Sequence, residues 1–217
     1  MPFKYSCFIS YRHGQNRLTE RIINDLSEAL SAELAAYFDK EIFLDRERLK
    51  GGTFFNEQLA CAICESVCLI VVYTPVYFSA EHIYCTREYR AMEKLEAVRL
   101  QALKLPADRQ NGLIIPIVFR GADELPSDIK TTRQYYDFQD FDPTEPEMIR
   151  SDKYYDQIRT IAKYIYDRYK TLTRVKDLDP CTDCPNFMMP AEEEVKKWLD
   201  RLEINSPAFP MREGDNR

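Results

Sequence analysis

The chain has 217 residues, of which 45% are hydrophobic and 30% charged, and its formal net charge is −6. These proportions are typical of a folded globular protein and exclude a disordered chain, and the length predicts one domain of usual size with a short appendage. The negative charge disfavours a protein that holds nucleic acid through its phosphates. The most apolar stretch, 67–76, spans about ten residues, whereas roughly 20 cross a bilayer. Because the N-terminus also lacks an apolar signal region, we expect a cytoplasmic protein with no membrane partner.

Strand-like and helix-like segments alternate along the chain. Apolar runs predict strands over 3–11, 41–45, 67–73, 113–119 and 135–137. Apolar residues at helical spacing predict helices over 18–34, 55–63, 86–105 and 155–169. This alternation predicts an α/β fold of flavodoxin-like order 2-1-3-4-5, with a five-stranded parallel sheet and helices on both faces. Pro116, inside the fourth strand, predicts a position where one backbone donor is not required.

The long third helix is predicted to turn one apolar side to the core. That side holds Tyr89, Met92, Leu95, Val98 and Leu103.

The predicted domain covers 1–170 and is followed by an extension over 171–217. Within the extension, Val195, Trp198, Leu199 and Leu202 follow the spacing of an amphipathic helix at about 191–203. One such helix cannot bury its apolar face alone, so it packs on its own domain or, as the alternative, on a partner. The last residues, 211–217, are predicted to be disordered.

Seven cysteines and only two histidines limit the possible metal sites. The spacing of Cys61, Cys64 and Cys68 is explained better by buried free thiols than by metal ligation. Cys181 and Cys184 form a single C-x-x-C pair, whereas a structural zinc needs four ligands. We therefore predict no metal. A zinc shared between chains and a redox dithiol remain as alternatives.

A candidate site follows from the predicted topology. In an open sheet of this order, ligands bind beyond the carboxyl ends of the strands, between strands one and three. Segments 10–14, 45–53 and 74–88 meet there and supply cations for phosphates, glycines for close backbone approach, stacking rings and one carboxylate. In that order, these residues are Arg12, Arg46, Arg48 and Lys50; Gly51 and Gly52; Tyr11 and Tyr84; and Glu88. They suit a nucleotide with a bond to break at its ribose, although each residue taken singly also fits an ordinary turn or surface role.

Several of these stretches resemble the signature boxes of Toll/interleukin-1 receptor (TIR) domains. Phe8-Ile9-Ser10-Tyr11 resembles the first box, and Phe43-Leu44-Asp45 with the following loop 46–54 is similar to the second strand and BB loop. Tyr84-Cys85-Thr86-Arg87-Glu88 resembles the aromatic-Cys-x-x-Glu box, with Tyr84 where Trp is commoner. The resemblance covers about 4–170 and includes its boxes in the family's order.

The resemblance implies an activity and a set of site residues. Many members of this family cleave NAD at the nicotinamide–ribose bond, and their catalytic glutamate matches Glu88. NAD would be the substrate, and no separate cofactor is implied. The residues expected to bind it are Ser10, Tyr11, Arg12, Asp45, Arg46, Lys50, Gly51, Gly52, Tyr84 and Cys85.

The resemblance also implies partners. Homo-oligomers form in this family through TIR–TIR contacts that involve the loop matching 46–54. The short chain is similar to the TIR enzymes of bacterial antiphage systems of the Thoeris type, in which a separate effector protein responds to a nucleotide product. That product is linear ADP-ribose, a cyclic isomer or a conjugate.

Two further classes of protein share this fold. Some TIR domains are non-catalytic adaptors that act by homotypic assembly, and this is the alternative to an enzyme. A phosphorylated receiver domain would need acidic residues directly after the first strand, where this chain has Ser10-Tyr11-Arg12-His13.

Overall fold

A parallel sheet forms the centre of the molecule. The computed structural model describes residues 3–14, 17–44, 55–80, 83–104, 111–141, 151–174 and 184–202. Its strands are β1 (Tyr5–Tyr11), β2 (Glu41–Leu44), β3 (Ser66–Tyr73), β4 (Ile114–Val118) and β5 (Tyr136–Asp137). They pair in the order β2-β1-β3-β4-β5, and every pairing is parallel. The predicted α/β fold and strand order are therefore confirmed.

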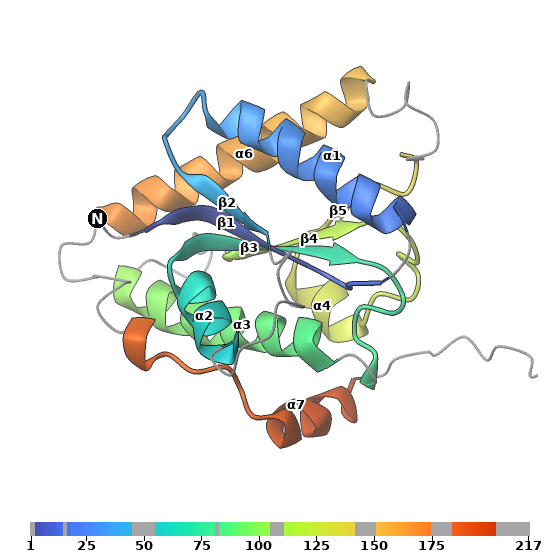
Figure 1. The fold of residues 1–217 in the computed structure, drawn as a ribbon, viewed down its shortest axis with the longest axis vertical. Coiled ribbons are helices and arrows are strands. Elements are labelled where there is room, and N and C mark those ends of the chain that lie inside the picture. Colours follow the sequence, from blue (N-terminus) through green and yellow to red (C-terminus); the bar gives the residue numbers. More distant parts are fainter. Residues whose placement is uncertain are drawn as a thin grey trace, which may run out of the picture.

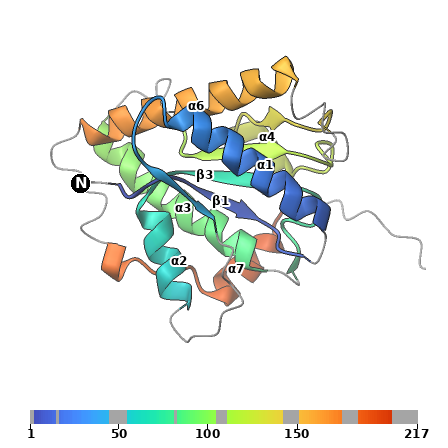
Figure 2. The same cartoon turned by 45° about the horizontal axis from the view of Figure 1, so that its top comes forward.

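Two layers of helices cover the sheet (Figures 1 and 2). On one face, α1 (Arg17–Leu34) packs against α6 (Asp152–Thr173). The other face carries α2 (Phe55–Cys64) and α3 (Ile83–Leu103), with the short α4 (Ser127–Thr132) on the same side. Helix α1 forms because a leucine or isoleucine recurs every four residues from Leu18 to Leu34, and Leu26, Leu30 and Leu34 are all buried in the core.

Pro116 lies inside β4, opposite Val71 of β3. Proline is unusual inside a strand because it has no N–H group to donate to a neighbouring strand. Phe119 N donates to Tyr73 O, so the odd-numbered residues of β4 direct their N–H groups toward β3. Pro116 therefore faces the side of β5, and β5 pairs only with Ile117 and Val118. No donor is needed at Pro116, which confirms the prediction.

Helix α3 buries charged residues, contrary to the predicted apolar side. Tyr89 and Met92 are buried as expected, but Val98 is 63% exposed, so its predicted place in the core is wrong. Glu96 and Arg99 are buried instead. Glu96 accepts hydrogen bonds from Leu113 N and from both terminal nitrogens of Arg133, and Arg99 donates to the carbonyls of Cys64 and Ser66. The charges can be buried because each has these partners.

The C-terminal segment 184–202 crosses the outer side of α2 and α3 (Figure 1). It contains a 3₁₀ turn, η3 (Cys184–Asn186), and α7 (Glu192–Leu199), and α7 packs on α3. The predicted C-terminal helix thus packs on its own domain.

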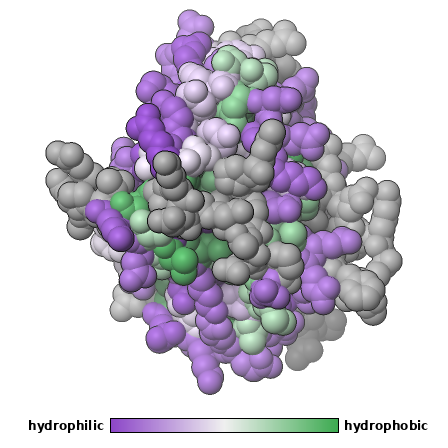
Figure 3. All heavy atoms as spheres, turned by 90° about the vertical axis from the view of Figure 1, so that its left-hand side faces the viewer, coloured by the Kyte–Doolittle hydropathy of each residue, from purple (hydrophilic) through white to green (hydrophobic). Residues whose placement is uncertain are grey.

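Figure 3 shows the face at the amino ends of the strands, where hydrophilic residues surround a smaller group of hydrophobic ones.

A disulfide joins this segment to the domain. Cys64, the last residue of α2, is bonded to Cys184, so the prediction that Cys64 is a free thiol is wrong. Cys68 is a buried free thiol as expected, and Cys61 is free but only half-buried. The pairing was not predictable because the two cysteines are 120 residues apart in the sequence.

Peptide mapping without reduction tests the disulfide. After alkylation of the unfolded protein, the Cys64 and Cys184 peptides should be recovered as one cross-linked species, while Cys7 and Cys68 carry the alkyl group. In the folded protein Cys7 should resist alkylation, because burial raises the pKa of Cys7 to about 12 and leaves little thiolate at neutral pH. Recovery of separately alkylated Cys64 and Cys184 peptides would contradict the bond.

Candidate functional site

The candidate site lies where β1 and β3 end. Ser10 and Tyr11 are the last two residues of β1 and pair with Val71 and Val72 of β3. Tyr77 follows β3 after a short turn. Glu88 comes from the second turn of α3, and its contact with Ser10 brings this turn to the same edge. The described segments of the predicted crevice therefore converge on one edge of the sheet.

Glu88 is fully buried and is fixed by a chain of hydrogen bonds. Ser10 Oγ donates to Glu88 Oε2 at 2.5 Å, and Ser10 Oγ and Tyr77 OH are 2.6 Å apart. Since the single hydroxyl proton of Ser10 goes to Glu88, Tyr77 is the donor in the second contact. Tyr77 OH also lies 3.3 Å from the carbonyl of Cys85. Ser10 thus holds the carboxylate in place and acts as a positioning residue. Hydrogen bonds to ionised groups are among the stronger ones in proteins.

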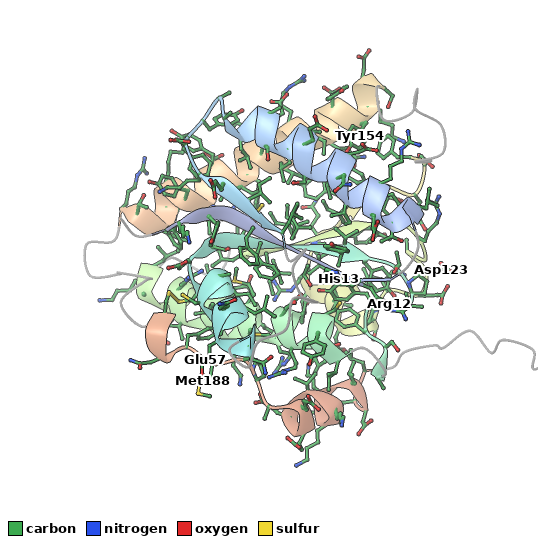
Figure 4. All side chains as sticks on the ribbon, viewed as in Figure 1. Arg12, His13, Glu57, Asp123, Tyr154 and Met188 are labelled. Carbon is green, nitrogen blue, oxygen red and sulfur yellow. A yellow bond between two sulfur atoms is a disulfide. The ribbon has the colours of Figure 1, made fainter. Side chains whose placement is uncertain are left out.

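The residues at the end of β1 form a second group. The rings of Tyr11 and His13 stack at 4.2 Å, and the thiol of Cys85 donates to the carbonyl of Tyr11 at 3.3 Å. Tyr11 and Cys85 are both buried, so they shape the end of β1 from within. Arg12 is half-buried, and within the described residues its Nε has no hydrogen-bond partner. Figure 4 labels Arg12 and His13 at this end of the strand.

Tyr84 and Arg87 form the outer edge of the site. The Tyr84 ring is 41% exposed, and the guanidinium carbon of Arg87 lies 5.8 Å from its centroid. Arg87 is buried and donates to the carbonyl of Pro190 at 2.9 Å and to Asn56 Oδ1 at 3.4 Å. One side chain thus links the exposed ring, the start of α2 and the C-terminal segment.

Several predicted site residues fall outside the described residues. These are Asp45, Arg46, Arg48, Lys50, Gly51 and Gly52, with the whole loop 46–54. Conversely, Tyr77 and Arg87 contact the candidate site but were not selected from the sequence. Tyr77 had one available signal, its position directly after a strand that ends at the predicted crevice.

The described ranges contain neither a candidate metal site nor a candidate membrane span. No group of three or more His, Cys, Asp or Glu side chains there is arranged to hold a metal ion. None of the helices in this part of the chain is both long and apolar enough to cross a bilayer.

Comparison with known proteins gives the family. A model of the TIR domain matches residues 7–150, and the chain therefore belongs to the TIR domain family. No curated protein matches the chain. Among solved structures, the chain is similar to the TIR domains of the activated Roq1 resistosome directly recognizing the pathogen effector XopQ. That match has 19% identity and a TM-score of 0.39, and it covers 90% of this chain and 98% of the other. The family assignment rests on the family model.

Substitution of Ser10 by alanine tests the hydrogen bond to the carboxylate. Ser10→Ala should lower the free energy of unfolding by about 1.5–3 kcal/mol, because it removes a buried bond to a charged group. Ser6→Ala is the matched control on the same strand. Ser6 is also buried but donates to a neutral carbonyl, that of Glu41 at 3.0 Å, so its loss should cost about 1 kcal/mol. Equal costs in urea unfolding would contradict the assigned contact.

Proposed function

We propose that this TIR domain cleaves the nicotinamide–ribose bond of NAD, with Glu88 as its catalytic carboxylate. The observation that supports this most is the position of Glu88. Its carboxylate accepts a hydrogen bond from Ser10, which is in turn held by Tyr77, at the edge of the sheet where the strand order reverses. In folds of this kind that edge is where ligands bind.

The reaction needs one negative charge at the ribose. When the C1′–N bond of NAD breaks, its electron pair goes to nicotinamide, which leaves as a neutral molecule, and the ribose develops oxocarbenium character. A fixed carboxylate beside C1′ stabilises that charge, as carboxylates do in glycoside hydrolysis. Water then adds to C1′ and loses a proton to give ADP-ribose. Attack by a group of the same nucleotide gives a cyclic isomer, and attack by another acceptor gives a conjugate.

Other residues would bind the nucleotide. Arg12 has a buried Nε with no hydrogen-bond partner within the described residues, which suits an anion such as the diphosphate. Arg46 and Lys50 would add charge from the neighbouring loop, where Asp45, Gly51 and Gly52 complete the wall. The exposed ring of Tyr84 offers a stacking surface. In this proposal, NAD is the substrate and no separate cofactor is used.

The burial of Glu88 supports low activity in the resting monomer. The side chain is 0% exposed, so a substrate can reach the carboxylate only after a local rearrangement. We infer that assembly of several copies through the loop 46–54 brings about that rearrangement. A separate effector that responds to the product would place the protein in a Thoeris-like antiphage system.

The proposed cytoplasmic location must accommodate the disulfide. Disulfides persist mainly in oxidising compartments and are rare in the cytosol. Cys64 and Cys184 are both buried, which restricts access of cytoplasmic thiols to the bond.

A non-catalytic adaptor is the second candidate function. The same full burial of Glu88 favours it, since an adaptor needs no accessible carboxylate. In that case Ser10 and Glu88 would serve only to fasten α3 to β1.

Incubation with NAD tests the proposed chemistry. At high protein concentration the wild type should release nicotinamide, and Glu88→Gln should lose at least a hundredfold in rate because it removes the stabilising charge without changing the side-chain shape. Glu28→Gln, an exposed position on α1 across the sheet, should match the wild type. Mass-resolved chromatography of the products reports which of the three acceptors is used. Equal turnover by Glu88→Gln would remove Glu88 from the chemistry, and no turnover by any form would favour the adaptor.

Dependence on protein concentration tests the assembly step. The rate per subunit should rise with concentration, and tethering of two copies should raise it at low concentration. Light scattering on the same samples gives the oligomeric state. If dilute monomer already reaches the full rate per subunit, assembly is not the trigger.

A further inference from the structure

We propose that the C-terminal segment 184–202 is a positioning element for Glu88 and acts through the residues on both sides of it. The catalytic part of this inference rests on the proposed function. The segment lies outside the residues matched by the TIR domain model, which end at 150.

The first contact is made by Arg87, the residue before Glu88. Its Nε donates to the carbonyl of Pro190 in the segment at 2.9 Å, and the side chain is only 7% exposed. A buried guanidinium requires such acceptors, so Arg87 depends on the segment for one of them. Through Asn56 and Tyr84 the same side chain also reaches the start of α2 and the exposed ring of the candidate site.

The second contact is made by Tyr89, the residue after Glu88. The ring of Trp198 lies 5.6 Å from that of Tyr89 and 5.7 Å from that of Phe78. The guanidinium carbon of Arg90 lies 5.2 Å from the Trp198 ring. Both sequence neighbours of Glu88 are therefore held from outside by the segment, while Ser10 holds Glu88 from inside.

The segment is fixed well enough to act in this way. The Cys64–Cys184 disulfide anchors its start to α2, and Val195 and Leu199 of α7 are buried. Lys94 of α3 adds an exposed ion pair with Glu194 at 3.0 Å. Exposed pairs contribute little, so the disulfide, the Arg87 contact and the Trp198 ring are the anchors that matter. Figures 1 and 2 show α7 on the outer side of α3, away from the sheet.

Displacement of a catalytic group from its position affects mainly the rate of the chemical step. Glu88 stabilises charge that develops in the transition state, so displacement should lower kcat more than it raises KM. A segment with a merely structural role would instead lower stability and leave kcat per folded molecule unchanged.

The experiment combines NAD kinetics with hydrogen exchange of residues 84–90 in the full chain. Trp198→Ala and Cys184→Ala should each lower kcat roughly 10-fold or more, with KM changed less than about threefold. Both should speed amide exchange over 84–90, and Trp198→Phe, which keeps a ring, should restore kcat and protection. The matched controls are Lys94→Gln, which removes only the exposed ion pair, and Cys61→Ala, which removes a free thiol one turn before Cys64. Both controls should behave as the wild type.

The two readouts separate this inference from the proposed function. If the wild type does not cleave NAD, the proposed function fails, and exchange over 84–90 still decides whether the segment positions this turn. If exchange over 84–90 is unchanged in Trp198→Ala and Cys184→Ala, the inference is overturned whether or not the wild type is active. Faster exchange with an unchanged kcat in an active protein also overturns it, because the segment would then be structural only.

Discussion

The contact between Ser10 and Glu88 is the interaction on which the candidate site depends. It joins the end of strand β1 to the second turn of α3, and it does so inside the protein, where a carboxylate is costly without a donor. Tyr77 completes the arrangement by donating to Ser10 from beyond β3. Three elements that are distant in sequence are thus brought to one point by polar groups rather than by apolar packing alone.

The same requirement recurs along α3. This helix lies between the sheet and the C-terminal segment, so both of its long sides are covered. Arg87, Glu88, Glu96 and Arg99 are all buried in it, and each has hydrogen-bond partners from other elements. The helix is therefore oriented by directional contacts at several levels. Satisfied buried polar contacts of this kind rigidify a structure, so they also fix the position of the carboxylate that the helix carries.

Much of the fold could be predicted from the sequence because the strands are apolar runs bounded by turns and the helices follow their leucine spacing. Pro116 was also interpretable, since a missing donor limits where a residue can sit in a sheet. The prediction that Val98 lies in the core is wrong because helical periodicity considers only apolar residues. It gives no sign that Glu96 and Arg99 can be buried through hydrogen bonds to other parts of the chain. The Cys64–Cys184 bond and the contact of Arg87 with Pro190 each join segments that are far apart in the sequence. The spacing of residues along the chain does not predict which distant segments will meet. Glu88 follows from the topology of the predicted crevice and from the signature boxes, and Ser10 follows from the boxes. Tyr77 has only its position after β3 as a signal, and the contacts of Arg87 are visible only in three dimensions.

The disulfide has a topological consequence. Because it links Cys64 to Cys184, it closes a covalent ring that contains β3, α3, β4, α4, β5 and α6. A single cut of the backbone anywhere in that ring would leave one molecule rather than two fragments until the bond is reduced. The unfolded chain is also confined by the ring, which limits how far the two ends of α3 can separate from the strands they must rejoin. Most of the sheet and the helix that carries Glu88 therefore belong to a closed loop, while β1, which carries Ser10, lies outside it and reaches Glu88 only by folding.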